Sequence, residues 1–416
     1  MSHSILQAGP ANKKHRYAIL SKVLDHTKKQ IETVCRHYIE EQRSLGLSIT
    51  DAEQLLQFAF LVRSSTTSEI QKFLLHPTSQ YWLSAMRRVS GNVDVQHPIP
   101  IVQQAASLGI QLSVAAKAEH HWQVKLDIEG GLRAPIYDRH LEFGPARANQ
   151  AIELRCQRGS ISVHFPDGLN IELPIEDYAG ESATPLPKVE KDGFSINTYN
   201  LISDSGTQLQ CRDEWLRPHW TGTNERNTGT HFFGACAEQY PQEFPVTPYR
   251  QAMEKIEQAS SEIAEDVKAF TPVLVPRTTG PHKKIGFTVL SRQGAMFLDP
   301  DEPDIMAENI IHENAHVKLR YMQLVDPILE DFYAQDEVER FAVPWRPDPR
   351  PLAGILEGAY VFSNVLDHRR KADAVHGSVE ELENDIEGAI EILAKHGKFT
   401  GSGRVFLDEL ADWRGR

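Results

Sequence analysis

The segment His312-Glu313-Asn314-Ala315-His316 has the residue types and the spacing of a metal-binding helix. On a helix, residues four positions apart project from one face about one turn apart, so the two imidazoles can converge on a single metal ion. With 18 histidines in the chain, such an HExxH pattern can also arise by chance or from two core histidines. The mostly apolar residues around the motif predict a buried helix with both imidazoles on its inward edge, which favours metal ligation.

A catalytic metal normally takes a third protein ligand and keeps other positions open for substrate or water. Glu357 lies in the largely apolar segment 351–362, which predicts a buried helix. A carboxylate in such a helix is costly to bury unless it is paired or bound to a metal. We therefore expect Glu357 to be the third ligand, with a surface or salt-bridged role as the alternative. Three further histidines lie among charged residues and are expected to face solvent, namely His368, His376 and His396.

Two chemistries fit such a site, and the residues alone do not separate them. With Zn²⁺, Glu313 would be the catalytic general base that activates a metal-bound water, and the protein would be a metallopeptidase of the HExxH-plus-Glu type. With Fe²⁺, the same ligands would form a facial triad of two histidines and one carboxylate, whose open positions take a 2-oxo acid and O₂. The reaction would then be an oxygenation.

The segment 343–351, Val-Pro-Trp-Arg-Pro-Asp-Pro-Arg-Pro, separates the motif from Glu357. Its four prolines predict an extended strap that carries Arg346 and Arg350. Arginine is well suited to bidentate binding of a carboxylate, so one of the two can hold the distal carboxylate of 2-oxoglutarate. A structural strap salt-bridged to the acidic C-terminal third of the chain is an equally good interpretation.

The elements that must position these residues are mainly helices. Residues 299–303, Asp-Pro-Asp-Glu-Pro, predict the start of the HExxH helix, and residues 285–298 predict one or two strands before it. Further upstream, apolar residues keep the helical period from Pro248 to Phe270, which predicts one long helix packed against a core.

The N-terminal and middle parts of the chain show different patterns. The first ninety residues predict helices, with Thr50-x-x-Glu53 as a capping box before an apolar face formed by Leu55, Leu56, Ala59 and Phe60. Short alternating segments from 111 to 173, of which 111–115 is the first, predict strands.

The predicted fold class is therefore α+β: mostly helical, with a β-rich middle section and a zincin-like HExxH helix in the C-terminal part. We expect a helical region at 1–110, a β-rich and loop-containing region with a candidate peptide groove at 111–247, and a mainly helical metal-binding catalytic region at 248–416.

Composition excludes several classes of protein. The chain has 416 residues and a net charge of −13, which argues against nucleic-acid binding by phosphate neutralisation. Residues 301–416 hold 24 acidic and 13 basic residues, so most of the negative charge lies there. No apolar run approaches the ~18 residues of a membrane span, and no secretory segment is recognisable. Four widely spaced cysteines indicate reduced thiols, and we expect a cytoplasmic protein.

The chain resembles the family of HExxH-motif proteins associated with ribosomally made, post-translationally modified peptides. The resemblance is carried by the HExxH segment itself, by Leu-x-Asp-Pro at 324–327, by Pro-Trp-Arg-Pro-Asp-Pro-Arg-Pro at 344–351, and by Gly-Ile-Leu-Glu-Gly-Ala-Tyr at 354–360. Weaker similarities, such as Leu-Leu-His-Pro at 74–77 and Phe-Thr-x-x-Gly at 399–403, extend it over most of the chain.

This resemblance implies a non-haem iron, 2-oxoglutarate-dependent hydroxylase that acts on a side-chain β-carbon of a precursor peptide, which it recognises in part through a leader. It implies iron ligation by His312 and His316, with Glu357 at the third-ligand position and an arginine of the strap on the co-substrate. Glu313 would then orient a ligand imidazole or contact substrate. A zinc metallopeptidase and a non-catalytic leader-peptide-binding protein are the alternative functions.

Overall fold

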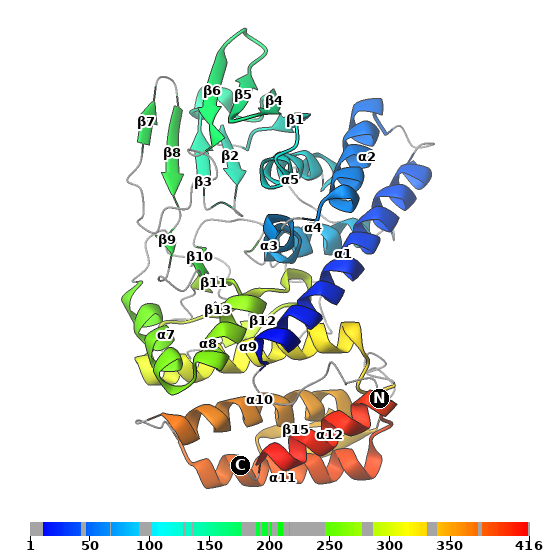
Figure 1. The fold of residues 1–416 in the computed structure, drawn as a ribbon, viewed down its shortest axis with the longest axis vertical. Helices are drawn as coiled ribbons and strands as arrows, with labels where there is room; N and C mark the ends of the chain where they lie inside the picture. The colour runs from blue at the N-terminus through cyan, green and yellow to red at the C-terminus, as the bar shows by residue number, and fades with distance from the viewer. Residues whose placement is uncertain are drawn as a thin grey trace. The chain divides into compact units, whose positions relative to one another are not determined.

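The chain, as a computed structural model, separates into two compact units, which are described here one at a time (Figure 1). Unit 1 comprises residues 1–23, 239–288 and 296–416, and unit 2 comprises residues 24–238 and 289–295. The structure describes residues 11–42, 47–66, 68–90, 101–127, 130–134, 137, 139–175, 189–191, 194–198, 200–201, 207–210, 216, 246–276, 286–330, 339–372 and 377–414.

Unit 2 begins within a long helix and continues with four shorter ones, as the sequence predicts. Its helices are α1 (Lys13–Gln42, from Leu24 onward), α2 (Ile49–Ser64), α3 (Ser68–Leu75), α4 (Pro77–Ser90) and α5 (Ile101–Ala116). Helices α2, α3 and α4 all pack against α5.

The start and the buried face of α2 differ from the prediction. Ser48, not Thr50, is the N-cap: its hydroxyl accepts a hydrogen bond from the Asp51 backbone N–H. Leu55 and Ala59 are buried, but Leu56 and Phe60 are 54% and 65% exposed. Each residue turns a helix by about 100°, so the four predicted residues spread around α2. Leu56 and Phe60 therefore lie beyond the side that α5 covers.

Two antiparallel sheets form the β-rich middle, which confirms that prediction. The first has the order β1-β4-β5-β6, with β1 (His120–Lys125), β4 (Ala151–Gln157), β5 (Ser160–His164) and β6 (Asn170–Pro174). The second has the order β2-β3-β8-β7, with β2 (Gly131–Ala134), β3 (Arg139–Glu142), β8 (Phe194–Thr198) and β7 (Val189–Lys191). The short strands β9 (Asn200–Leu201) and β10 (Gln208–Leu209) pair with each other, and η3 (Pro145–Arg147) is a 3₁₀ turn.

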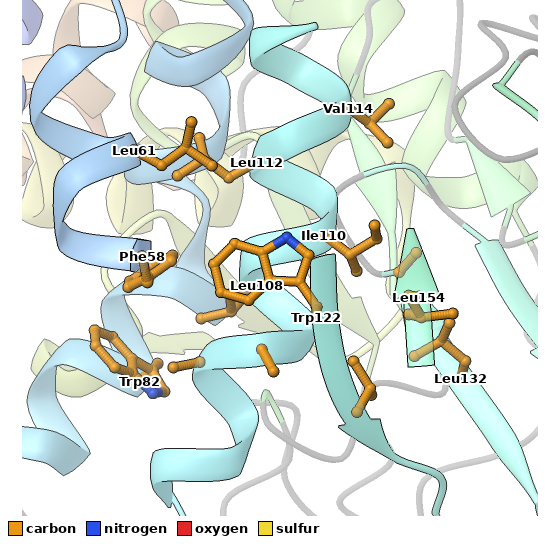
Figure 2. Close-up of a cluster of buried hydrophobic side chains, with 14 of the residues drawn as sticks. Phe58, Leu61, Trp82, Leu108, Ile110, Leu112, Val114, Trp122, Leu132 and Leu154 are labelled. Carbon is orange, nitrogen blue, oxygen red and sulfur yellow. The ribbon is translucent and has the colours of Figure 1, made fainter. Parts of the chain in front are cut away.

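The prediction of a strand at 111–115 is wrong, because these residues form the last turns of α5. Both the apolar and the polar residues of this stretch are buried. The alternation of polar and apolar residues therefore does not separate an exposed side from a buried side here. In Figure 2 the Trp122 indole of β1 lies beside α5, and both belong to one core cluster of buried residues. The Ser113 hydroxyl accepts a hydrogen bond from the Trp122 indole at 2.9 Å, which satisfies two polar groups in this core.

Unit 1 contains the remaining helices and a three-strand group. Its elements after α1 are α7 (Thr247–Ala259), α8 (Ser261–Phe270), β11 (Val273–Pro276), β12 (Gly286–Thr288), β13 (Ala295–Leu298), α9 (Pro303–Val325), β14 (Arg340–Val343), β15 (Arg346–Pro351), α10 (Leu352–Lys371), α11 (Val379–His396) and α12 (Gly401–Arg414). Strands β12 and β13 are antiparallel neighbours and flank the 3₁₀ turn η5 (Leu290–Arg292), in agreement with the predicted strands before the HExxH helix. Helices α10, α11 and α12 pack together as the orange to red helices of Figure 1.

The single long helix expected from Pro248 to Phe270 is two helices. The chain leaves the helical conformation at Ser260, whose φ is −160° and whose hydroxyl accepts a hydrogen bond from the Ile263 backbone N–H. Ser260 is therefore the N-cap of α8. Apolar periodicity continues across the break because α7 and α8 both pack against α9.

The structure confirms a mixed α+β protein that is mainly helical with several antiparallel sheets. Within the described part of the chain, no helix is long and apolar enough to cross a membrane. Much of the candidate peptide groove at 111–247, including 176–188 and 217–245, lies outside the described residues, as do Cys211 and Cys236. Cys35 and Cys156 are buried free thiols.

Candidate metal centre

The HExxH motif lies in the middle of α9, a helix whose beginning is encoded locally. Glu302 is the N-cap residue, Pro303 occupies the first helical position, and Asp304 adds an acidic side chain to the first turn. Proline and acidic residues both favour a helix N-terminus. The helix packs against α7, α8, α10 and β12, so the motif is held by unit 1 on several sides.

His312 and His316 lie on one face of α9, as their spacing predicts. Their ring centroids are 5.0 Å apart, and the planes meet at 66°. Burial, together with the neighbouring His316 and opposed by the charge of Glu357, lowers the pKa of His312 to about 3. Burial, followed by the charges of Arg320 and Arg350, lowers the pKa of His316 to about 3. Both imidazoles are therefore neutral at pH 7, which is the form that binds a metal ion.

Glu357 of α10 lies beside this histidine pair. Its Oε2 atom is 4.0 Å from His316 Nδ1, and its Oε1 atom is 3.9 Å from Nε of Arg320. The side chain keeps 22% of its exposure. Glu357, predicted to be the third ligand, thus lies near His316, and its carboxylate also faces the cation of Arg320.

The donor atoms suit a metal ion, but their spacing is wide. Among the described residues, no three His, Cys, Asp or Glu side chains come close enough together to hold an ion. Two donors bound to one ion at about 2.1 Å each would stand about 3 to 3.5 Å apart, so the 4.0 Å gap from Glu357 Oε2 to His316 Nδ1 is about 0.5 to 1 Å wider than joint ligation requires. His316 Nδ1 is buried and has no hydrogen-bond partner among the described atoms, which leaves a donor atom for that purpose.

Glu313 points to a different neighbourhood from the two histidines. Its side chain is buried against β12, where a Cβ on Gly286 would stand 3.3 Å from Oε1 of the carboxylate. Burial raises the pKa of Glu313 to about 8, while the Arg320 charge and the Thr288 hydroxyl lower it and the Glu357 charge raises it.

The strap at 343–351 is extended, as its prolines predict, and forms the hairpin of β14 and β15. Prolines are accepted there because each strand of a two-stranded sheet has a free edge. Asp348 lies between the two arginines, 3.0 Å from Arg346 Nε and 3.3 Å from Arg350 Nη1. The side chain of Arg346 is 42% exposed, so its contact with Asp348 lies at the surface. The charge of Arg350 acts on His316 as well as on Asp348.

Of the other candidate histidines, the two that the structure describes, His368 and His396, lie apart from the site. His368 is buried near the end of α10, so the expectation that it faces solvent is wrong. It follows Glu357 by eleven residues, a rise of about 16 Å along a helix. His396 stacks against Phe341 with ring centroids 4.5 Å apart, and His376 lies outside the described residues.

Two kinds of residue at this site were not predicted from the sequence. Arg320 follows His316 by four positions, so the spacing that selected the histidines also places this arginine on their face of α9. Phe362 and Trp345 form an aromatic wall: the Phe362 ring lies 6.2 Å from the His312 ring and 5.2 Å from the Trp345 ring. Gly358 permits this contact, since a Cβ there would stand 2.9 Å from the indole.

Fold and geometry together define an α+β protein with two neutral histidines, a carboxylate and two arginines around one face of an HExxH helix. No family model matches the chain, and no curated protein sequence matches it significantly.

Proposed function

We propose that the chain is an iron- and 2-oxoglutarate-dependent hydroxylase, with a zincin-like HExxH helix, that acts on a side-chain β-carbon of a ribosomally synthesised precursor peptide. The observation that carries this proposal is the cluster of two neutral imidazoles, the Glu357 carboxylate and the Arg320 and Arg350 charges. Two histidines and one carboxylate are the ligand set of non-haem iron oxygenases.

In this function His312, His316 and Glu357 would hold the ion, which supplies redox chemistry for O₂ and 2-oxoglutarate when it is bound. The protein side chains have separate tasks. Phe362 and Trp345 cover the His312 side with aromatic surface, which limits water at the site. Burial keeps Glu313 mainly protonated at pH 7, and Arg320 offsets the charge of Glu357, so a bound divalent cation leaves the site with excess positive charge. A dianionic dicarboxylate such as 2-oxoglutarate would offset this charge.

A zinc metallopeptidase is the second candidate, and the position of Glu313 is the observation that favours it. The carboxyl lies on α9 next to His312 and faces β12, so it is available as a general base if a water occupies that side. The two arginines argue against this function, since a peptide bond is neutral and does not need two cations beside the metal.

The test is anaerobic reconstitution of the protein with Fe²⁺, followed by addition of 2-oxoglutarate, O₂ and a candidate precursor peptide encoded nearby. We expect succinate formation together with a gain of one oxygen atom in the intact peptide mass. His312→Ala should lose both signals because one ligand is gone, whereas Glu313→Gln should keep them, since a glutamine of the same shape can remain at β12. Arg370→Gln at the exposed end of α10, where the arginine pairs with Glu383, is the matched control.

The same assay separates the alternatives. Peptide fragments that disappear in Glu313→Gln would support the peptidase. A peptide that binds tightly but is recovered unchanged, without succinate, would support a non-catalytic leader-peptide-binding protein. Either result would overturn the proposed hydroxylase.

A further inference from the structure

Arg320 contacts two side chains at the candidate metal centre, Glu357 and Thr288. Its Nε atom lies 3.9 Å from Oε1 of Glu357, and its Nη1 atom donates a hydrogen bond to the Thr288 hydroxyl at 3.2 Å. Its charge also acts on Glu313 and His316. The side chain keeps only 14% of its exposure, so this cation lies within the site and not on the surface of α9.

We propose that Arg320 is a positioning residue that holds the Glu357 carboxylate toward His316 and thereby sets the affinity of the centre for a divalent metal ion. This inference rests on the proposed function, because it requires that the centre bind a metal. The proposed role is to position Glu357, and it does not require Arg320 to contact the co-substrate.

The two oxygens of Glu357 face different partners. Oε1 is directed to Arg320 and Oε2 to His316, at nearly equal distances of 3.9 and 4.0 Å. A carboxylate that turns freely in solvent loses rotational freedom when it binds a metal ion. A carboxylate already held through one oxygen loses less, because its other oxygen is already directed to the ion. Since Glu357 is 22% exposed, it could otherwise turn outward.

Arg320 is itself held in place. It shares α9 with His316, one helical turn away, so a single rigid element fixes the cation relative to the ligand imidazole. Thr288 of β12 binds the other end of the guanidinium and thereby restricts its rotation. The nearby Arg350 is less suited to this role, because its guanidinium pairs with Asp348 of the exposed strap.

Arg320 should have two opposite effects on metal binding. As a positive charge it repels a divalent cation, and removing it would tighten binding whether or not Glu357 is present. As a support for Glu357 it strengthens binding, and removing it would weaken binding only when Glu357 is present. The sign of the change and its dependence on Glu357 therefore separate positioning from plain charge repulsion.

The experiment is a double-mutant cycle on the full-length, metal-free protein, with Co²⁺ titrated by calorimetry and by its visible absorption bands. We expect Arg320→Gln to weaken Co²⁺ binding by about 10- to 100-fold, the range found when a partner of a metal-binding carboxylate is removed. In the Glu357→Gln background the same change should not weaken binding. Arg320→Lys should recover part of the affinity, and Thr288→Val should give a smaller loss of the same sign.

The controls separate this inference from the proposed function. Arg370→Gln, which removes an arginine charge from the exposed end of α10, should leave the Co²⁺ affinity unchanged. Equal effects of Arg320→Gln in both backgrounds, or tighter binding in the wild-type background, would overturn the role of Arg320 and leave the metal site intact. Wild-type protein that binds no Co²⁺, or binds it as well after His312→Ala, would overturn the proposed function and this inference together. If Arg320→Gln does not fold, Thr288→Val decides the question in the same two backgrounds.

Discussion

At the residue scale, His76 shows how one buried imidazole can make the stability of the protein depend on pH. It lies between α3 and α4, with its side chain buried. Its Nδ1 atom accepts a hydrogen bond from the Thr78 backbone N–H, so the ring proton is on Nε2, which donates to Gln208 at 3.1 Å. Burial lowers the pKa of His76 to about 4, and the bond to Gln208 opposes this shift only in part.

The folded-state pKa of His76 lies below its ordinary value of about 6.5. As the pH falls from 6.5 to about 4, His76 therefore takes up a proton mainly in the unfolded chain. We therefore expect stability that is present above pH 6.5 to be lost on acidification to about pH 4, by about 3 kcal/mol in total. The measurement is urea unfolding of wild type and His76→Gln at pH 7 and pH 4.5. The variant should lose about 2 to 3 kcal/mol less than wild type over that interval. The same pH dependence in both proteins would contradict the role given to His76.

The residues of the candidate site differ in how far the sequence could identify them. Helical geometry is periodic, so the spacing of His312 and His316 alone predicts that they share a face. Glu357 could be selected because a carboxylate in an apolar helix needs a partner. Arg320 has the same helical spacing, but an arginine on α9 also fits a solvent-facing position. Thr288 belongs to another strand, and no local pattern indicates which distant side chain it meets.

At the scale of elements, the contact between α5 and β1 depends on a glycine. A Cβ on Gly109 would overlap the Trp122 indole, which lies in the core shown in Figure 2. Glycine lowers helix stability by about 1 kcal/mol relative to alanine, yet this position in α5 requires it because no side chain fits. Gly388 in α11 is the opposite case, since a Cβ there meets nothing within 4 Å.

We accordingly expect Gly109→Ala to destabilise the protein by about 1 to 3 kcal/mol, because the added methyl group forces Trp122 out of its position. Gly388→Ala, the matched control, should instead stabilise it by up to about 1 kcal/mol through helix propensity. Both values follow from urea unfolding at neutral pH. A stabilising Gly109→Ala would mean that the indole can move without cost, contrary to the packing described.

Element types were easier to predict than element ends. The strands before α9 and the extended strap follow from alternation and from proline, which act locally. The break at Ser260 was missed because apolar periodicity continues across it, and the cap at Ser48 was missed because Thr50 and Glu53, just after it, also match a capping box. In each case a single hydroxyl marks where the helix starts. The last turns of α5 were predicted as a strand because burial on all sides removes the helical pattern.

At the scale of the whole molecule, the described residues of the candidate metal centre lie in unit 1, which contains α9, α10, β12 and the β14–β15 hairpin. A ligand that binds only the folded state stabilises it by RT ln(1 + [L]/Kd), which is about 2.7 kcal/mol at 100 times Kd. Metal binding should therefore act first on those local openings of unit 1 that separate α9 from α10.

We expect saturating Zn²⁺ to slow amide hydrogen exchange in α9 and α10 by up to about 100-fold, and to leave α5 and β1 of unit 2 unchanged. Hydrogen-exchange mass spectrometry of the full chain, with and without a chelator, measures this difference. His312→Ala is the necessary control because residues 301–416 carry an excess of acidic side chains that can bind Zn²⁺ weakly at the surface. Slower exchange that persists in His312→Ala, or that is equal in both units, would show that the ion binds elsewhere than between α9 and α10.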